Sequence, residues 1–195
     1  MSIIKKRIGV FETNSSAMHS IVVTNKDEHY SEEEKELCVY IFEGNLEFDR
    51  SSDLEFGRCP FEVLATFYDK LRYAIPSFFS KYNGRSYEEE NNPLYDDPRW
   101  NELMTILHSH FKEFKTIELP KNSWYKTKDT GEYQMYFGDI ETDSTLLERF
   151  LKREKITLEE FLTNRKYIII VDGDEYCIFE TLKEELGINP VKEFE

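Results

Sequence analysis

The residues most capable of chemistry lie close together, between Phe11 and Ser20 (Phe-Glu-Thr-Asn-Ser-Ser-Ala-Met-His-Ser). This stretch holds a carboxylate at Glu12, an imidazole at His19 and, between them, hydroxyl and carboxamide side chains. A carboxylate beside an imidazole orients the ring, favours its protonated form and creates an acid–base unit. Short polar side chains and backbone N–H groups can hold a phosphate. The stretch therefore predicts a site that binds an anion or moves protons.

The segments on either side predict how this site is positioned. Residues 3–11 and 18–24 have the pattern of strands, and alternate residues of a strand share a face. In an antiparallel hairpin, Glu12 and His19 would stand opposite each other at the loop end, where cross-strand side chains interact. We predict Glu12 and His19 as catalytic residues. The predicted substrate-binding residues are Thr13, Asn14, Ser15, Ser16 and Ser20.

A purely structural interpretation of the same stretch stays open. Asn and Ser are common turn residues because their side chains hydrogen-bond their own backbone. An isolated histidine near the start of a strand, such as His19, is commonly structural. In this interpretation the stretch only builds a turn between two strands.

Other polar residues favour structural roles. His108 and His110 are two positions apart on a predicted helix and point away from each other, so we assign them to its surface. Asp172, Asp174 and Glu175 follow a predicted buried strand, where metal-binding carboxylates can lie. They equally fit a turn followed by negative charge at a helix N-terminus, which the helix dipole favours. We predict no metal and no cofactor.

The charge of the chain limits its partners. Its 195 residues include 39 acidic and 25 basic side chains, which gives a net charge of −14. Such a surface repels nucleic acid at long range, because phosphate binding needs Lys and Arg, so we expect no binding to free DNA. The charge can serve solubility, or it can steer the protein to a basic protein partner. The acidic runs Glu32–Glu34 and Glu88–Glu90 are expected to be solvated.

The sequence also predicts where the protein works. It has three isolated cysteines without metal-binding spacing, which indicates a reducing compartment (Cys38, Cys59 and Cys177). The N-terminal residues lack the apolar run of a signal peptide, and no segment approaches the roughly 20 apolar residues of a membrane span. We therefore expect a cytoplasmic protein with no membrane partner.

The hydrophobic pattern predicts one α+β domain over residues 1–195, with a helical insertion at 58–112 as an option. We expect a mixed or antiparallel sheet, opened by the N-terminal hairpin, with about five helices packed on it. Hairpin strands are predicted at 37–42 and 45–49, and a central strand at 167–171. Predicted helices begin at Pro60, at Pro98, at Asp143 or Ser144, and after Thr157, and a last one follows Asp172.

The segment Glu12–Ser20 resembles the N-terminal signature of a family of small proteins from phages and mobile elements of Gram-positive bacteria. The family's form is Glu-Thr-Asn-Ser-Ser-Ser-x-His-Ser, and here its third serine is replaced by Ala17. Segments 138–151 and 171–175 are also similar to the C-terminal half of the family. Some similar proteins are anti-CRISPR inhibitors of type II systems, and at least one truncates guide RNA.

The resemblance implies a counter-defence protein of the host bacterial cytoplasm that inhibits a type II RNA-guided nuclease, by cleaving or blocking its guide RNA. A catalytic version would be a metal-independent endoribonuclease with His19 as general acid or base and Glu12 orienting it. The expected partners are the basic effector nuclease and its guide RNA. Two alternatives stay open: a non-catalytic acidic protein that occupies a basic nucleic-acid channel, and a phage regulatory protein in which the motif is only a turn.

Overall fold

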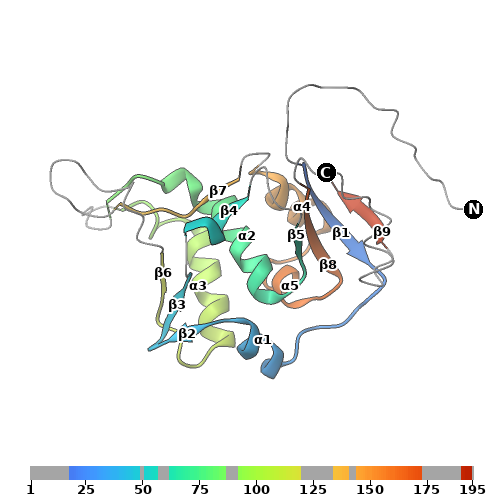
Figure 1. The fold of residues 1–195 in the computed structure, drawn as a ribbon, viewed down its shortest axis with the longest axis horizontal. Coiled ribbons are helices and arrows are strands. Elements are labelled where there is room, and N and C mark those ends of the chain that lie inside the picture. Colours follow the sequence, from blue (N-terminus) through green and yellow to red (C-terminus); the bar gives the residue numbers. More distant parts are fainter. Residues whose placement is uncertain are drawn as a thin grey trace, which may run out of the picture.

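The computed structural model describes residues 18–48, 51–56, 62–86, 92–119, 134–140, 144–172 and 190–194. These residues form an α+β fold with five α-helices and three small sheets, as the sequence predicts (Figure 1). No helix among them has the length and apolar character needed to cross a membrane.

The largest sheet has four strands in the order β5–β8–β1–β9. Strand β8 (Tyr167–Asp172) lies between β5 (Glu62–Leu64) and β1 (Met18–Thr24), antiparallel to both, which confirms the predicted central strand. The other edge of β1 pairs with β9 (Pro190–Phe194), which the sequence pattern did not reveal. The strand predicted over 18–24 is thus confirmed, with neighbours that come from the C-terminal part of the chain.

The second sheet is built on a tight hairpin. Strands β2 (Ile41–Phe42) and β3 (Asn45–Glu47) are antiparallel, and β3 also pairs in parallel with β6 (Thr116–Glu118). Both turn residues have positive φ, 52° at Glu43 and 92° at Gly44, as two-residue hairpins require. The predicted strand over 37–42 was too long, because its first residues belong to helix α1.

A third, two-stranded sheet pairs β4 (Glu55–Phe56) in parallel with β7 (Asp139–Ile140). A 3₁₀ turn, Ser51–Leu54, leads directly into β4. Next to β7, Gly138 has a φ of +84°, and a Cβ there would lie 2.0 Å from the carbonyl oxygen of Leu54. Only glycine therefore allows this approach.

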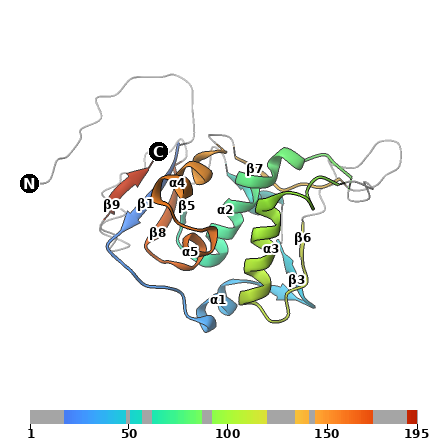
Figure 2. The same cartoon turned by 180° about the vertical axis from the view of Figure 1, so that it is seen from behind.

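Helix α2 (Phe67–Phe79) occupies the middle of the molecule. It lies between the four-stranded sheet, with α4 and α5, and helix α3 on the other side (Figures 1 and 2). Thr66 and Asp69 form a capping box that starts the helix at Phe67. The prediction of one helix from Pro60 was wrong over Glu62–Leu64, because Val63 and Leu64 pair with β8. A short 3₁₀ turn, Ser80–Tyr82, follows α2.

The other helices surround α2. Helix α3 (Pro98–His110) begins at the predicted proline, and α5 (Leu158–Thr163) follows the predicted cap, Thr157. Helix α4 (Leu146–Glu154) is confirmed with Thr145 at its N-cap position. Helix α1 (Glu32–Cys38) was not predicted, although Ser31 and Glu34 form a capping box. The helix predicted after Asp172 lies outside the described residues.

The core is rich in aromatic side chains. Phe79 makes edge-to-face contacts with Trp100, and Phe161 lies in a cluster with Phe150 and Tyr167. Such arrangements are favoured by the ring quadrupole and add to the burial term. Aromatic side chains therefore supply much of the buried apolar surface of the core.

Candidate functional site

The predicted catalytic histidine lies on the inner face of β1. His19, Ile21 and Val23 share this face, as strand parity predicts, and all three are buried. His19 retains 6% of its surface exposed and lies opposite Val171 of β8. Its imidazole therefore belongs to the packed interior of the sheet.

The contact that positions His19 comes from α2. Its Nδ1 atom is hydrogen-bonded to the hydroxyl of Tyr73 at 3.1 Å, and the two rings meet edge to face with centroids 5.6 Å apart. Tyr73 is itself fully buried. Burial lowers the pKa of His19 to about 4, because the interior disfavours the charged form. The imidazole is thus neutral at pH 7, whereas a neighbouring carboxylate was expected to favour the protonated ring.

Of the predicted substrate-binding residues, Ser20 lies within the described residues and the others lie outside them. Ser20 is described: it is 8% exposed and points to the opposite face of the sheet from His19. Residues 3–11 and the predicted Glu12, Thr13, Asn14, Ser15 and Ser16 lie outside the described residues. Over Ile21–Val23, one edge of β1 pairs with β8 and the other with β9.

A second cluster of titratable groups joins three helices. The ammonium of Lys35 on α1 donates to Nδ1 of His110 at 2.8 Å and to Glu32 at 2.5 Å. On the other side of the ring, Nε2 of His110 donates to Glu159 of α5 at 2.6 Å. Because an ammonium only donates, these contacts assign the proton of His110 to Nε2. The prediction that His110 is merely a surface residue missed this role.

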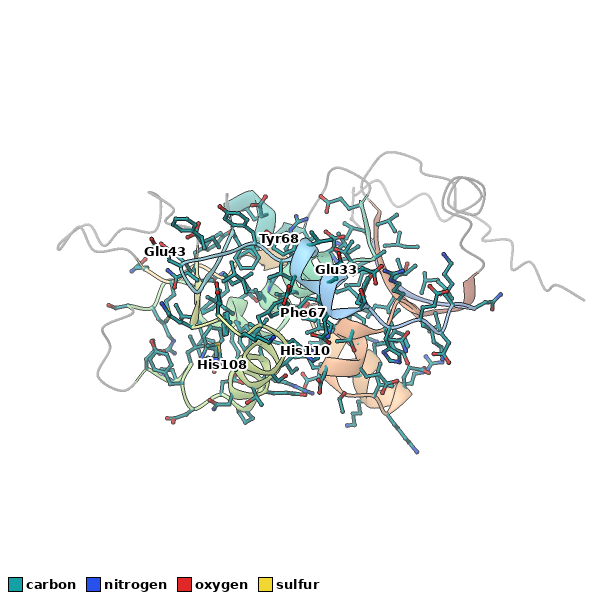
Figure 3. All side chains as sticks on the ribbon, turned by 90° about the horizontal axis from the view of Figure 1, so that it is seen from below. Glu33, Glu43, Phe67, Tyr68, His108 and His110 are labelled. Atoms are coloured by element: carbon teal, nitrogen blue, oxygen red, sulfur yellow. The ribbon has the colours of Figure 1, made fainter. Side chains whose placement is uncertain are left out.

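The neighbouring histidine behaves as predicted. His108 is exposed, and its ring packs edge to face on Phe114 with centroids 4.9 Å apart. Its side chain does not share the contacts of His110, because residues two apart on a helix diverge. The view from below in Figure 3 shows both histidines at the end of α3.

Lys70 of α2 is a fully buried cation that sequence reasoning did not single out. Its ammonium donates to the carbonyls of Phe161 at 2.8 Å and Asn164 at 2.9 Å, at the end of α5. The rings of Tyr30 and Phe161 lie 5.2 and 5.5 Å from it. Burial lowers the pKa of Lys70 to about 7. The contacts describe an internal cap for α5, which has unsatisfied carbonyls at its C-terminus.

The described residues offer no set of three or more metal-ligating side chains. Asp172 ends β8, and the other two carboxylates of the predicted acidic turn, Asp174 and Glu175, lie outside the described residues. The run Glu88–Glu90 also lies outside the described residues. Among the aromatic residues, Trp100 is buried in the core and Tyr95 is 56% exposed.

The run Glu32–Glu34 is more than a solvated face. Glu34 hydrogen-bonds the backbone N–H of Ser31 and forms an ion pair with Arg165. Lys35 is buried, and its ammonium contacts His110 of α3. Glu33 is exposed on the outer face of the helix. Charge patterning alone did not reveal that a helix forms here and is held to the rest of the fold.

An exposed apolar surface continues from this helix into the next strand. Leu37, Tyr40 and Phe42 are 78%, 61% and 52% exposed. Together with the exposed carboxylates Glu33 and Glu36 they define the α1–β2 surface. The sequence signal that could have predicted this surface is the Ser31–Glu34 capping box, followed by the apolar residue Leu37 on the polar side of the helix.

Comparison of the chain with protein-family models, with curated proteins and with solved structures gave no match.

Proposed function

We propose that this protein is a counter-defence inhibitor, from a phage or mobile element, that binds a basic nucleic-acid-binding protein without catalysing a reaction. The α1–β2 surface carries the proposal, because large exposed apolar side chains next to carboxylates are typical of protein-interaction sites. The resemblance of Glu12–Ser20 to the mobile-element signature makes a type II RNA-guided nuclease the partner to test first.

The net charge supports this choice of partner. A chain with a charge of −14 associates faster with a basic protein than with a neutral one, and it is repelled by free RNA. A nuclease that binds a guide RNA presents a basic channel. Docking on such a protein reconciles an acidic inhibitor with a target that handles RNA.

The environment of His19 favours binding over catalysis. A general acid or base must come within hydrogen-bond reach of the group that it serves, about 2.6–3.2 Å. His19 is 6% exposed and already bonded to Tyr73, so a phosphodiester would have to enter the core of the sheet to meet it. We therefore assign His19 to the packing of β1 on α2.

The test is an inhibition assay with purified components. A type II effector loaded with guide RNA is incubated with the protein, and cleavage of target DNA and binding to the effector are both followed. We expect inhibition of target cleavage. We also expect the complex to weaken as salt rises from about 50 to 500 mM, because the Debye length falls about threefold over this range. Inhibition should persist in His19→Gln. Loss of inhibition in that folded variant, or no complex with any type II effector tested, would contradict the proposal.

A further inference from the structure

We propose that the α1–β2 surface docks a cationic protein segment that carries apolar side chains of its own. The inference deepens the proposed function, on which it rests, by naming the surface and the chemistry of its occupant. It assigns the apolar contacts to Leu37, Tyr40 and Phe42, and the electrostatic ones to Glu33 and Glu36.

The concentration of exposed apolar side chains is local. Of the four large hydrophobic residues that are exposed in the described part of the chain, three lie within the six residues Leu37–Phe42. The fourth, Tyr95, belongs to a different turn. Tyr40 and Phe42 are two residues apart in an extended segment, so they project from the same face. Scattered exposed hydrophobics need no explanation, but a group of this kind marks an interaction site.

The surface is held in place from behind. The inward side of α1 is fixed by Lys35, which bonds His110 of α3, and by Glu34, which pairs with Arg165. Positions 33, 36 and 37 share the opposite side of the helix, because residues three and four apart are neighbours. The outer face is therefore presented by a fixed helix, which reduces the ordering cost of binding.

The charge of the α1–β2 surface indicates which kind of partner binds there. In the described residues, Glu33 and Glu36 form no ion pair, whereas Glu32 is engaged by Lys35. Figure 3 shows Glu33 on α1 and Glu43 in the β2–β3 turn on the face seen from below. The cation next to that turn, Lys115, donates to the carbonyl of Glu43. A second copy of this chain would bring like charges together, so a cationic partner is favoured.

The first experiment measures binding of patch variants to the guide-loaded type II effector. The double variant Leu37→Ser/Phe42→Ser removes two apolar contacts, and we expect the dissociation constant to rise more than tenfold, as for central interface anchors. Tyr95→Ser is the matched control, because it removes an equally exposed aromatic ring elsewhere, and it should bind like the wild type. Equal binding of wild type and double variant would overturn the inference while leaving the proposed function in place.

A second pair of variants separates local from total charge. Glu33→Lys/Glu36→Lys should slow association and flatten its salt dependence, because it reverses charge at the docking surface. Asp96→Lys/Glu148→Lys changes the net charge equally at exposed positions outside it. If both pairs slow association to the same extent, the acidic residues act only through net charge and the assigned surface is wrong.

A model peptide tests the surface independently of the effector. The probe is a lysine–leucine peptide of amphipathic pattern, compared with an oligolysine of equal charge. We expect the amphipathic peptide to bind at least tenfold more tightly and to protect backbone amides of residues 32–43 from hydrogen exchange. Equal affinity for both peptides, or protection confined to other segments, would refute the inference even if no effector binds. Absence of effector binding with specific peptide binding would instead refute the choice of effector.

Discussion

The ammonium of Lys35 lies 2.8 Å from Nδ1 of His110, and this contact joins α1 to the end of α3. Lys35 has 4% of its side chain exposed, so its ammonium has little access to water. The loss of His110 would leave this buried donor with Glu32 as its remaining acceptor among the described residues. The pair therefore links the α1–β2 surface to the stability of the fold.

We predict that His110→Ala lowers the free energy of unfolding by about 1–3 kcal/mol, because it removes one of the two acceptors of the buried Lys35 ammonium. His108→Ala is the matched control on the same helix and should stay within about 0.5 kcal/mol of the wild type, because His108 is exposed. Urea unfolding at pH 7 measures both. Equal stabilities of the two variants would show that the Lys35–His110 contact contributes nothing.

From the lowered pKa of Lys70 we predict how the free energy of unfolding changes with pH in alkaline solution. Its pKa falls from 10.5 to about 7 on folding, so between these values the unfolded chain binds more protons than the folded one. Stability should therefore rise with pH through this window, by at most about 1.4 kcal/mol per pH unit from this group. As the pH falls well below 7 both states become protonated, and the dependence on Lys70 disappears.

The variant Lys70→Met should remove this slope. Lys152→Met, at an exposed position of α4, should retain it. Denaturant unfolding at several pH values between 7 and 10 measures the slope for each. A slope that is identical in the wild type and Lys70→Met would show that Lys70 titrates alike in both states.

From the lowered pKa of His19 we predict that acid reduces the stability of the fold. Its pKa is 6.5 when unperturbed and about 4 in the folded protein, so the unfolded chain binds more protons between these values. The stability that a neutral His19 confers is present above pH 6.5 and is lost as the pH falls toward 4. His19→Gln should make unfolding less dependent on pH in this window, as measured by thermal melts. An unchanged pH dependence would contradict burial of a neutral imidazole.

Alanine variants at two glycines separate the cost of a steric clash from the cost of a left-handed backbone conformation. Gly138 and Gly84 have nearly the same φ, +84° and +83°, but a Cβ would meet Leu54 only at Gly138. Gly84→Ala should cost about 1 kcal/mol, for the left-handed backbone alone. Gly138→Ala should cost clearly more, because β7 must move away from Leu54. Thermal and urea unfolding compare the two, and equal costs would contradict the close approach.

Much of the fold could be predicted from patterns among residues that are close together in the sequence. Pro98 and the apolar stripe after it predict α3, Thr157 predicts the start of α5, and the apolar run from Tyr167 predicts the central strand. Each depends on residues that are near one another in sequence. Where two local patterns competed, as at Val63 and Leu64, the helical stripe was the wrong choice because a distant strand, β8, pairs with them.

The candidate sites depend on distant contacts. Parity places His19, Ile21 and Val23 on one face, but only α2, through Tyr73, makes that face the inside. His110 meets Lys35 across 75 positions of the chain, so its spacing from His108 could not reveal the contact. An inspection of the acidic run at 32–34 for a capping box would have predicted α1. Which of its faces lies outward follows from tertiary packing.

The most direct test of non-catalytic binding analyses one sample in two ways. The protein is incubated with a guide-loaded type II effector, and the mixture is divided between a native gel and a denaturing RNA gel. We predict a shifted complex in the first, full-length guide RNA in the second, and the same result for His19→Gln. A guide RNA that is shortened by the wild type and intact with His19→Gln would contradict the account and make His19 catalytic.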